Sequence, residues 1–182
     1  MITVEPTTFT KVEYDADELA GYVQAALERV SGIPDNSDVL VTVLEDAATT
    51  TFRIRSIDPL VLEVDGGAVE NHKDPRRLGA HESAITFTRA LLEVYDRRAD
   101  WFHGPALDAA DVSLAHKAAW DVNLHGRVAG LGVRLHKPRY LYNFRNRHGF
   151  TDQADVVFEQ LWTAGETTWR RITELSDAAH SR

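Results

Sequence analysis

Apolar residues change their spacing twice along this chain, and this change limits the folds it can adopt. Between residues 15 and 32 they recur every three or four positions, which is typical of an amphipathic helix. Between residues 39 and 64 they alternate with polar residues, which is typical of strands with one buried face. The helical spacing returns from residue 75 onward. The sequence therefore predicts an α+β fold in which helices and strands are segregated.

The first helix and the strands that follow it have clear ends. Asp15 is a good N-cap, and Glu18 stands three residues later, as in a capping box. Three strands are expected where apolar and polar residues alternate, at 39–45, 51–57 and 60–64, with a brief fourth strand near 68–71. Because the connecting loops are short, we expect the strands to pair as a three- to four-stranded antiparallel meander.

Three helices are expected after the sheet, packed on one side of it. The first has Asp74 as its cap unless Gly79 delays its start, the second runs from Asp108 to about Gly130, and the third starts near Thr151 and extends over roughly 25 residues. We expect one domain, because 182 residues suffice for one core and are short for two. Its helix-plus-sheet part is 1–73, and its mainly helical part is 74–182.

The composition excludes several classes of site. The chain has no cysteine, which excludes disulfides, thiolate metal sites and a cysteine nucleophile. Its start lacks the basic and apolar segments of a signal peptide. It contains no run of about 18 apolar residues, so we expect no membrane span and a cytoplasmic location.

Charge is distributed unevenly along the sequence. The whole chain has a net charge of −8, and residues 1–121 carry −11 while 152–182 carry −3. The segment between them, 122–151, carries +6 and contains no acidic residue. Such asymmetry is typical of a surface that binds a partner of opposite charge.

The segment 137–150, KPRYLYNFRNRHGF, combines this charge with four aromatic rings. The stretch GLGVRLHKPRYLYNF (130–144), which overlaps it, is too rich in Gly and Pro for a continuous helix, so we expect a short strand or extended loop at YLYNF. In a strand, Tyr140, Tyr142 and Phe144 would share one face. Arginine binds phosphate and carboxylate in a bidentate manner, and the rings offer stacking surfaces.

The leading hypothesis is therefore a binding domain for a compact anionic ligand, bearing phosphate or carboxylate and a flat ring, or for an acidic partner segment. The binding residues would be Arg127, Arg139, Tyr140, Tyr142, Arg145, Arg147 and His148, in a pocket between 137–150 and the third helix of the chain. Long nucleic acid is not the expected partner, because the isoelectric point is near 5.4. The alternative is that these basic residues pair with the chain's own acids.

A second hypothesis is a small hydrolase, with or without a metal. Asp121 and His125 are four residues apart, so they would share a helix face, and His116 lies on a second polar stripe. The dipeptide HE at 81–82 lacks the second histidine of the zinc-protease motif. No G-x-S-x-G elbow or phosphate-binding loop occurs, and no cofactor is indicated.

A third hypothesis is a homo-oligomeric adaptor without a small ligand. Trp162 and Trp169 lie seven residues apart on the stripe of the last expected helix. Exposed tryptophans in an apolar patch are typical of protein interfaces. The homodimer would then form through residues 154–175.

Overall fold

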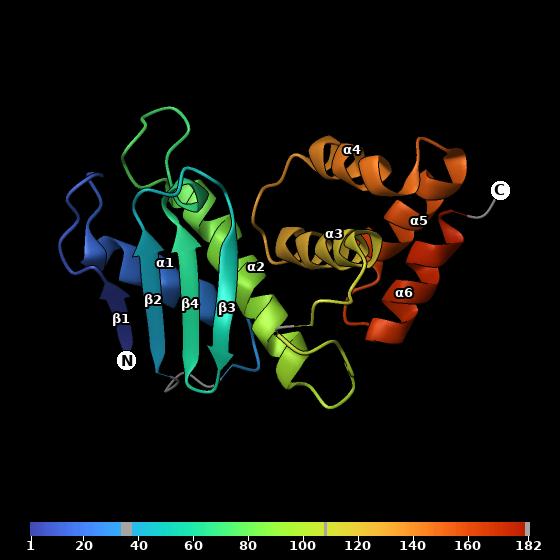
Figure 1. Ribbon diagram of the computed structural model, residues 1–182, viewed down its shortest axis with the longest axis horizontal. Helices are drawn as coiled ribbons and strands as arrows, with labels where there is room; N and C mark the ends of the chain where they lie inside the picture. Colours follow the sequence, from blue (N-terminus) through green and yellow to red (C-terminus); the bar gives the residue numbers. More distant parts are fainter. Residues whose placement is uncertain (34–37, 108, 181–182) are drawn as a thin grey trace. The chain divides into compact units, whose positions relative to one another are not determined.

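The computed structural model describes residues 1–33, 38–107 and 109–180, and it divides into two compact units (Figure 1). Unit 1, residues 1–95, contains the sheet, and unit 2, residues 96–182, is helical. The prediction of a single domain stays a prediction, because a division into compact units does not show whether either one folds alone. Over the described residues, no helix is long and apolar enough to cross a membrane.

Unit 1 is built on one mixed sheet of four strands, so the fold is of the mixed α/β kind. The strands are β1 (Ile2–Glu5), β2 (Val39–Leu44), β3 (Phe52–Ile57) and β4 (Leu60–Asp65), in the order β1-β2-β4-β3. β1 pairs parallel to β2, and β2 pairs parallel to β4. Only the β3–β4 pair is antiparallel.

The predicted meander is therefore wrong, although all three of its strands exist. β4 lies between β2 and β3 because β2 and β4 carry the buried apolar residues, among them Val41 and Leu62. β3 exposes Arg53 and Arg55, which suit an edge strand. The connection 45–51 reaches up to about 23 Å, enough to step across one intervening strand. β1 was not predicted, because four residues carry too little alternation.

The predicted first helix is confirmed as α1 (Ala16–Arg29). The Asp15 side chain accepts a hydrogen bond of 2.8 Å from the Glu18 backbone N–H, as an N-cap does. Both α1 and α2 (Ala80–Arg98) lie behind the sheet in Figure 1. Fully buried Leu19 of α1 and Phe87 of α2 contribute to the core of unit 1.

Two other predictions for unit 1 need correction. The short 3-10 helix η1 (Gly66–Ala68) and an isolated bridge from Glu70 to Leu78 replace the brief strand expected near 68–71. α2 begins at Ala80 rather than after Asp74, because residues 71–77 are tied into turns by backbone hydrogen bonds.

Unit 2 is organised around α3 (Leu114–Gly130), which packs against α4 (Lys137–His148), α5 (Asp152–Thr163) and α6 (Trp169–Ala178). Asp108, the predicted cap of α3, lies outside the described residues, and Ser113 is the N-cap in the structure. Five helices follow the sheet in the described chain, rather than three.

The predicted loop or strand at 137–150 is wrong, because this segment forms α4. Pro138 stands in the first turn of α4, where its missing N–H leaves no hydrogen bond unmade. Gly132, with φ 84°, precedes the helix and Gly149, with φ 101°, ends it. Pro138, which argued against a helix, thus lies at the start of α4, and Gly132 lies outside it at the end of α3.

The last predicted helix is two helices. The first of them, α5, starts near Thr151 as expected, and Thr151 is its N-cap, accepting a hydrogen bond from the Ala154 backbone N–H. The chain then bends at Gly165, which has φ 66° in the left-handed region that favours glycine. Thr168 caps α6 after the bend.

Candidate functional site

The aromatic residues of α4 divide between two faces of the helix. Phe144 and His148 are buried, with ring centroids 3.8 Å apart. Tyr140 lies against His125, at 4.2 Å between ring centroids. Tyr142 points outward and is 57% exposed. The stacking platform expected from a strand is therefore not formed, because in a helix residue 142 points away from the side that carries 140 and 144.

Arg127, one of the predicted ligand-binding residues, is occupied inside unit 2. Its Nη1 lies 2.6 Å from Oδ1 of Asp96, and both side chains are nine-tenths buried or more. Trp120 Nε1 donates to the other oxygen of Asp96 at 3.1 Å. Burial raises the pKa of Asp96, although Arg127 and Trp120 oppose that rise by donating hydrogen bonds. Arg127 is thus a structural residue at the junction of α2 and α3.

Two cations of α4, Arg145 and Lys137, form ion pairs with acids of α5. Arg145 donates from Nε to Asp155 Oδ1 at 2.7 Å and from Nη2 to the second oxygen. These hydrogen bonds lower the pKa of Asp155 and raise the pKa of Arg145. Lys137 Nζ lies 2.6 Å from Glu159 Oε2. Part of the basic segment is therefore paired with the chain's own acids.

The outward face of α4 keeps the remaining cations. Its exposed residues recur at helical spacing, and the exposed Phe150 follows the helix; the set is Arg139, Tyr142, Asn143, Asn146, Arg147 and Phe150. Tyr142 and Phe150 contact each other edge to face, at 5.9 Å between ring centroids. Within the described part of the chain, neither Arg139 nor Arg147 has an acidic partner. We call these six residues the α4 face.

His148, another predicted ligand-binding residue, points away from this face. Its Nδ1 lies 3.1 Å from the Phe144 carbonyl oxygen, and its Nε2 lies 2.8 Å from Ser176 Oγ. Burial lowers the pKa of His148 to about 4. The pair has the spacing of a nucleophile and its base. However, Ser176 has no exposed surface, so a substrate cannot reach its hydroxyl.

The residues of the metal hypothesis separate into two contacts. His116 Nε2 lies 2.8 Å from Asp177 Oδ1, on α6. His125 Nδ1 lies 2.8 Å from the Asp121 carbonyl oxygen and 3.3 Å from its carboxylate. Among the described residues, no three His, Asp or Glu side chains group as metal ligands. That His116, Asp121 and His125 bind a metal stays a prediction, and the structure places His116 and His125 in separate contacts.

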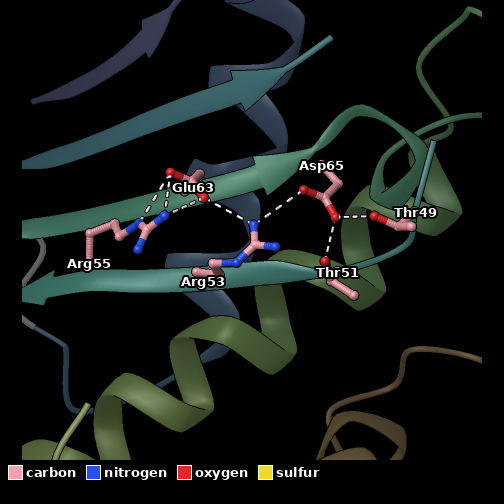
Figure 2. Close-up of polar contacts among 6 residues, drawn as sticks. All are labelled: Thr49, Thr51, Arg53, Arg55, Glu63 and Asp65. Atoms are coloured by element: carbon pink, nitrogen blue, oxygen red, sulfur yellow. Dashed lines mark hydrogen bonds and ion pairs between the residues drawn. The ribbon is translucent and has the colours of Figure 1, made fainter. Parts of the chain in front are cut away.

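A buried acid in unit 1 was not predicted. Asp65, at the end of β4, is 1% exposed and accepts hydrogen bonds from the hydroxyls of Thr49 and Thr51 (Figure 2). Arg53 Nη1 lies 3.4 Å from the other carboxylate oxygen and 3.0 Å from Glu63. Burial acts to raise the pKa of Asp65, but the two threonines and Arg53 outweigh it and hold the pKa below its ordinary value.

This cluster of Asp65, Thr49, Thr51 and Arg53 holds a loop in place and does not form a ligand-binding site. Its partners on the loop 45–51 hold that segment against the start of η1, where Gly67 N–H donates to the Ala47 carbonyl oxygen. A Cβ at Gly67 would lie 2.3 Å from the Ala48 carbonyl oxygen, so the loop and the glycine are in close contact. Both carboxylate oxygens of Asp65 are already engaged by the chain. The only sequence signal was three threonines before a strand.

The α4 face is thus the part of the predicted site that is still available to a partner. Comparison with known proteins adds nothing to this geometry: the chain matches no family model, no curated protein and no solved structure.

Proposed function

We propose that this chain is a protein-binding module that holds an acidic segment of a protein partner on the α4 face. The observation that supports this most strongly is the pair of exposed guanidinium groups, Arg139 and Arg147, without acidic partners in the described chain and flanking the exposed ring of Tyr142.

The charge of the surroundings supports an acidic partner. No acidic residue occurs between 122 and 151, so nothing on α4 itself competes for Arg139 and Arg147. Unit 2 has 12 basic and 11 acidic residues, a net charge of +1, whereas unit 1 has a net charge of −9. A local cationic face on an otherwise acidic chain steers an acidic partner to one place.

The shape of the face favours a polypeptide segment over a compact ligand. A compact anion needs donors that converge on one point. Two of the arginines predicted to bind such an anion are already paired: Arg127 with Asp96 and Arg145 with Asp155. Arg139 and Arg147 stand eight residues apart, about 12 Å along the helix. An extended or helical segment can reach both.

The exposed rings give the face an apolar centre. Tyr142 is 57% exposed and Phe150 is 63% exposed. Aromatic residues and arginine are enriched at protein interfaces, where rings supply buried area and guanidinium groups supply specificity. The partner segment should therefore carry an apolar residue between its acidic residues.

The test is a titration of a fluorescently labelled peptide with the protein, with fluorescence anisotropy as the readout of binding. The probe is a synthetic peptide with glutamates two helical turns apart and a leucine between them. We expect Arg139→Glu/Arg147→Glu to weaken binding about tenfold or more, and added salt to weaken wild-type binding. Arg170→Glu/Arg171→Glu is the matched control, since it changes the same charge at exposed positions of α6 and should bind as wild type does.

Equal weakening by both double variants would overturn the proposal, because binding would then follow net charge alone. Inorganic pyrophosphate and a short single-stranded oligonucleotide serve as competitors. Displacement of the peptide by either at lower concentration than by unlabelled peptide would favour a compact anion or nucleic acid instead.

A further inference from the structure

The exposed face of α5 is acidic where the α4 face is basic. Asp152, Val156 and Glu159 are spaced by four and three residues, so they lie on one side of α5. All three are exposed, with Val156 at 51%. Asp152 forms no ion pair within the described chain, and it stands about 10 Å from Glu159 along the helix.

The two faces match in both order and length. Along α4, Tyr142 lies between two cations about 12 Å apart. Along α5, Val156 lies between two anions at a similar separation. In order and axial spacing, the basic–aromatic–basic series of α4 therefore has an acidic–aliphatic–acidic counterpart in the same molecule.

α4 and α5 are also neighbours in unit 2. Lys137, at the start of α4, pairs with Glu159 in the second half of α5, and Arg145, near the end of α4, pairs with Asp155 near the start of α5. The two helices therefore run antiparallel, and each molecule carries both the basic and the acidic stripe. This is the arrangement that a two-fold symmetric contact requires, since one patch must be complementary to itself.

We propose that the acidic segment held by the α4 face is the α5 stripe of a second copy of this chain, so that two copies form a symmetric dimer through α4 and α5. This inference rests on the proposed function and names its partner. In the dimer, α4 of each copy lies on α5 of the other, and each of the two contacts pairs Arg139 and Arg147 with Asp152 and Glu159.

The distribution of exposed apolar side chains supports this contact. Tyr142, Phe150 and Val156 are each more than half exposed and fall within 15 residues of one another in the sequence. Exposed apolar residues gathered in this way mark interaction sites. The internal Lys137–Glu159 pair does not compete strongly, because its side chains are 39% and 56% exposed and exposed pairs are weak.

The experiment is a charge swap read by molar mass in solution, with sedimentation equilibrium or light scattering after gel filtration. The first variant is Arg139→Glu/Arg147→Glu and the second is Asp152→Lys/Glu159→Lys. We expect wild type to be a dimer and each variant alone to have a dimer dissociation constant raised about tenfold or more. An equimolar mixture of the two variants should recover a dimer containing one copy of each, because both contacts in the mixed dimer again pair opposite charges.

Val156→Glu is a second route to the same end, because it alters none of the internal ion pairs. It should also give monomers while keeping the wild-type circular dichroism spectrum. A dimer that survives Val156→Glu, or a mixture that associates no better than its separate components, would overturn the inference.

The outcomes separate this inference from the proposed function. A wild-type monomer that still binds the acidic peptide through Arg139 and Arg147 would overturn the dimer and leave the proposed function standing. A wild-type monomer that does not bind the peptide would overturn both. A dimer unaffected by either charge reversal would assign association to another surface, such as the Trp162 and Trp169 stripe of the predicted interface 154–175.

Discussion

His148 Nε2 lies 2.8 Å from Ser176 Oγ, and this contact joins the last residue of α4 to α6. The histidine is 4% exposed and the serine has no exposed surface. A neutral imidazole fits the contact, because it donates from Nδ1 to the Phe144 carbonyl oxygen and can accept the serine hydroxyl at Nε2. The end of the helix that carries the α4 face is therefore held by a group that must stay neutral.

The first prediction is that acid weakens the fold through His148. Its pKa is lowered from 6.5 to about 4, mainly by burial. The folded state then binds fewer protons than the unfolded state between these values. The stabilisation is complete above pH 6.5 and is lost as pH falls toward 4, by about 3 kcal/mol at most.

Urea unfolding at pH 7, 6, 5 and 4.5 measures this loss against the variant His148→Gln, which can keep a hydrogen bond to Ser176 but does not titrate. The free energy of unfolding of wild type should fall more steeply with acid than that of the variant. The same slope in both proteins would contradict the assignment, since carboxylates titrate alike in the two.

The second prediction concerns the loop fastened by Asp65. Asp65→Asn removes the charge that pairs with Arg53 and replaces one acceptor oxygen by a donor, while the site stays buried. We expect the free energy of unfolding to fall by about 1–3 kcal/mol. Chemical denaturation of the two proteins measures it.

Asp46→Asn is the control for Asp65→Asn. Asp46 also pairs with a cation, Lys11, but its side chain is 74% exposed, so the substitution should change stability by about 0.5 kcal/mol or less. Similar losses from both variants would mean that Asp65 is no more than a surface charge.

The third prediction compares two glycines of α3. A Cβ at Gly126 would lie 2.0 Å from the Trp162 carbonyl oxygen on α5, whereas a Cβ at Gly130 meets no heavy atom within 4 Å. Gly126→Ala should therefore lower the free energy of unfolding by about 1–3 kcal/mol or more through overpacking. Gly130→Ala should be neutral or raise it by up to about 1 kcal/mol.

Thermal unfolding of both variants tests the close approach of α3 and α5. If Gly126→Ala unfolds at the wild-type temperature, a Cβ fits between α3 and α5, and the close approach of Gly126 to Trp162 is contradicted. The structure locates the closest approach of α3 to the α5 backbone among these two positions at Gly126.

Features set by neighbouring residues could be predicted from the sequence. The cap at Asp15 and the helix start near Thr151 were predicted correctly, because a capping side chain bonds a backbone N–H two or three residues away. The three strands between residues 39 and 65 were found for the same reason, since alternation is local.

Features set by residues far apart in the sequence could not be predicted. Nothing near β3 indicates that β4 will insert between it and β2, because strand order depends on which strands can be buried on both sides. The glycines 130 and 132 and Pro138 were taken to break one segment, although the glycines lie at the end of α3 and Pro138 lies in the first turn of α4. For the site, the basic and aromatic composition of 137–150 was visible, but which arginines are paired depended on Asp96 and Asp155 in other helices.

The most direct test of the α4 face is to map the acidic peptide onto the protein by ¹H–¹⁵N NMR. Peptide-induced shift changes should be concentrated at Arg139, Tyr142, Asn143, Asn146 and Arg147, and they should vanish in Arg139→Glu/Arg147→Glu. Changes centred on unit 1, or spread over the surface without a maximum on α4, would contradict the central claim that this helix carries the binding function.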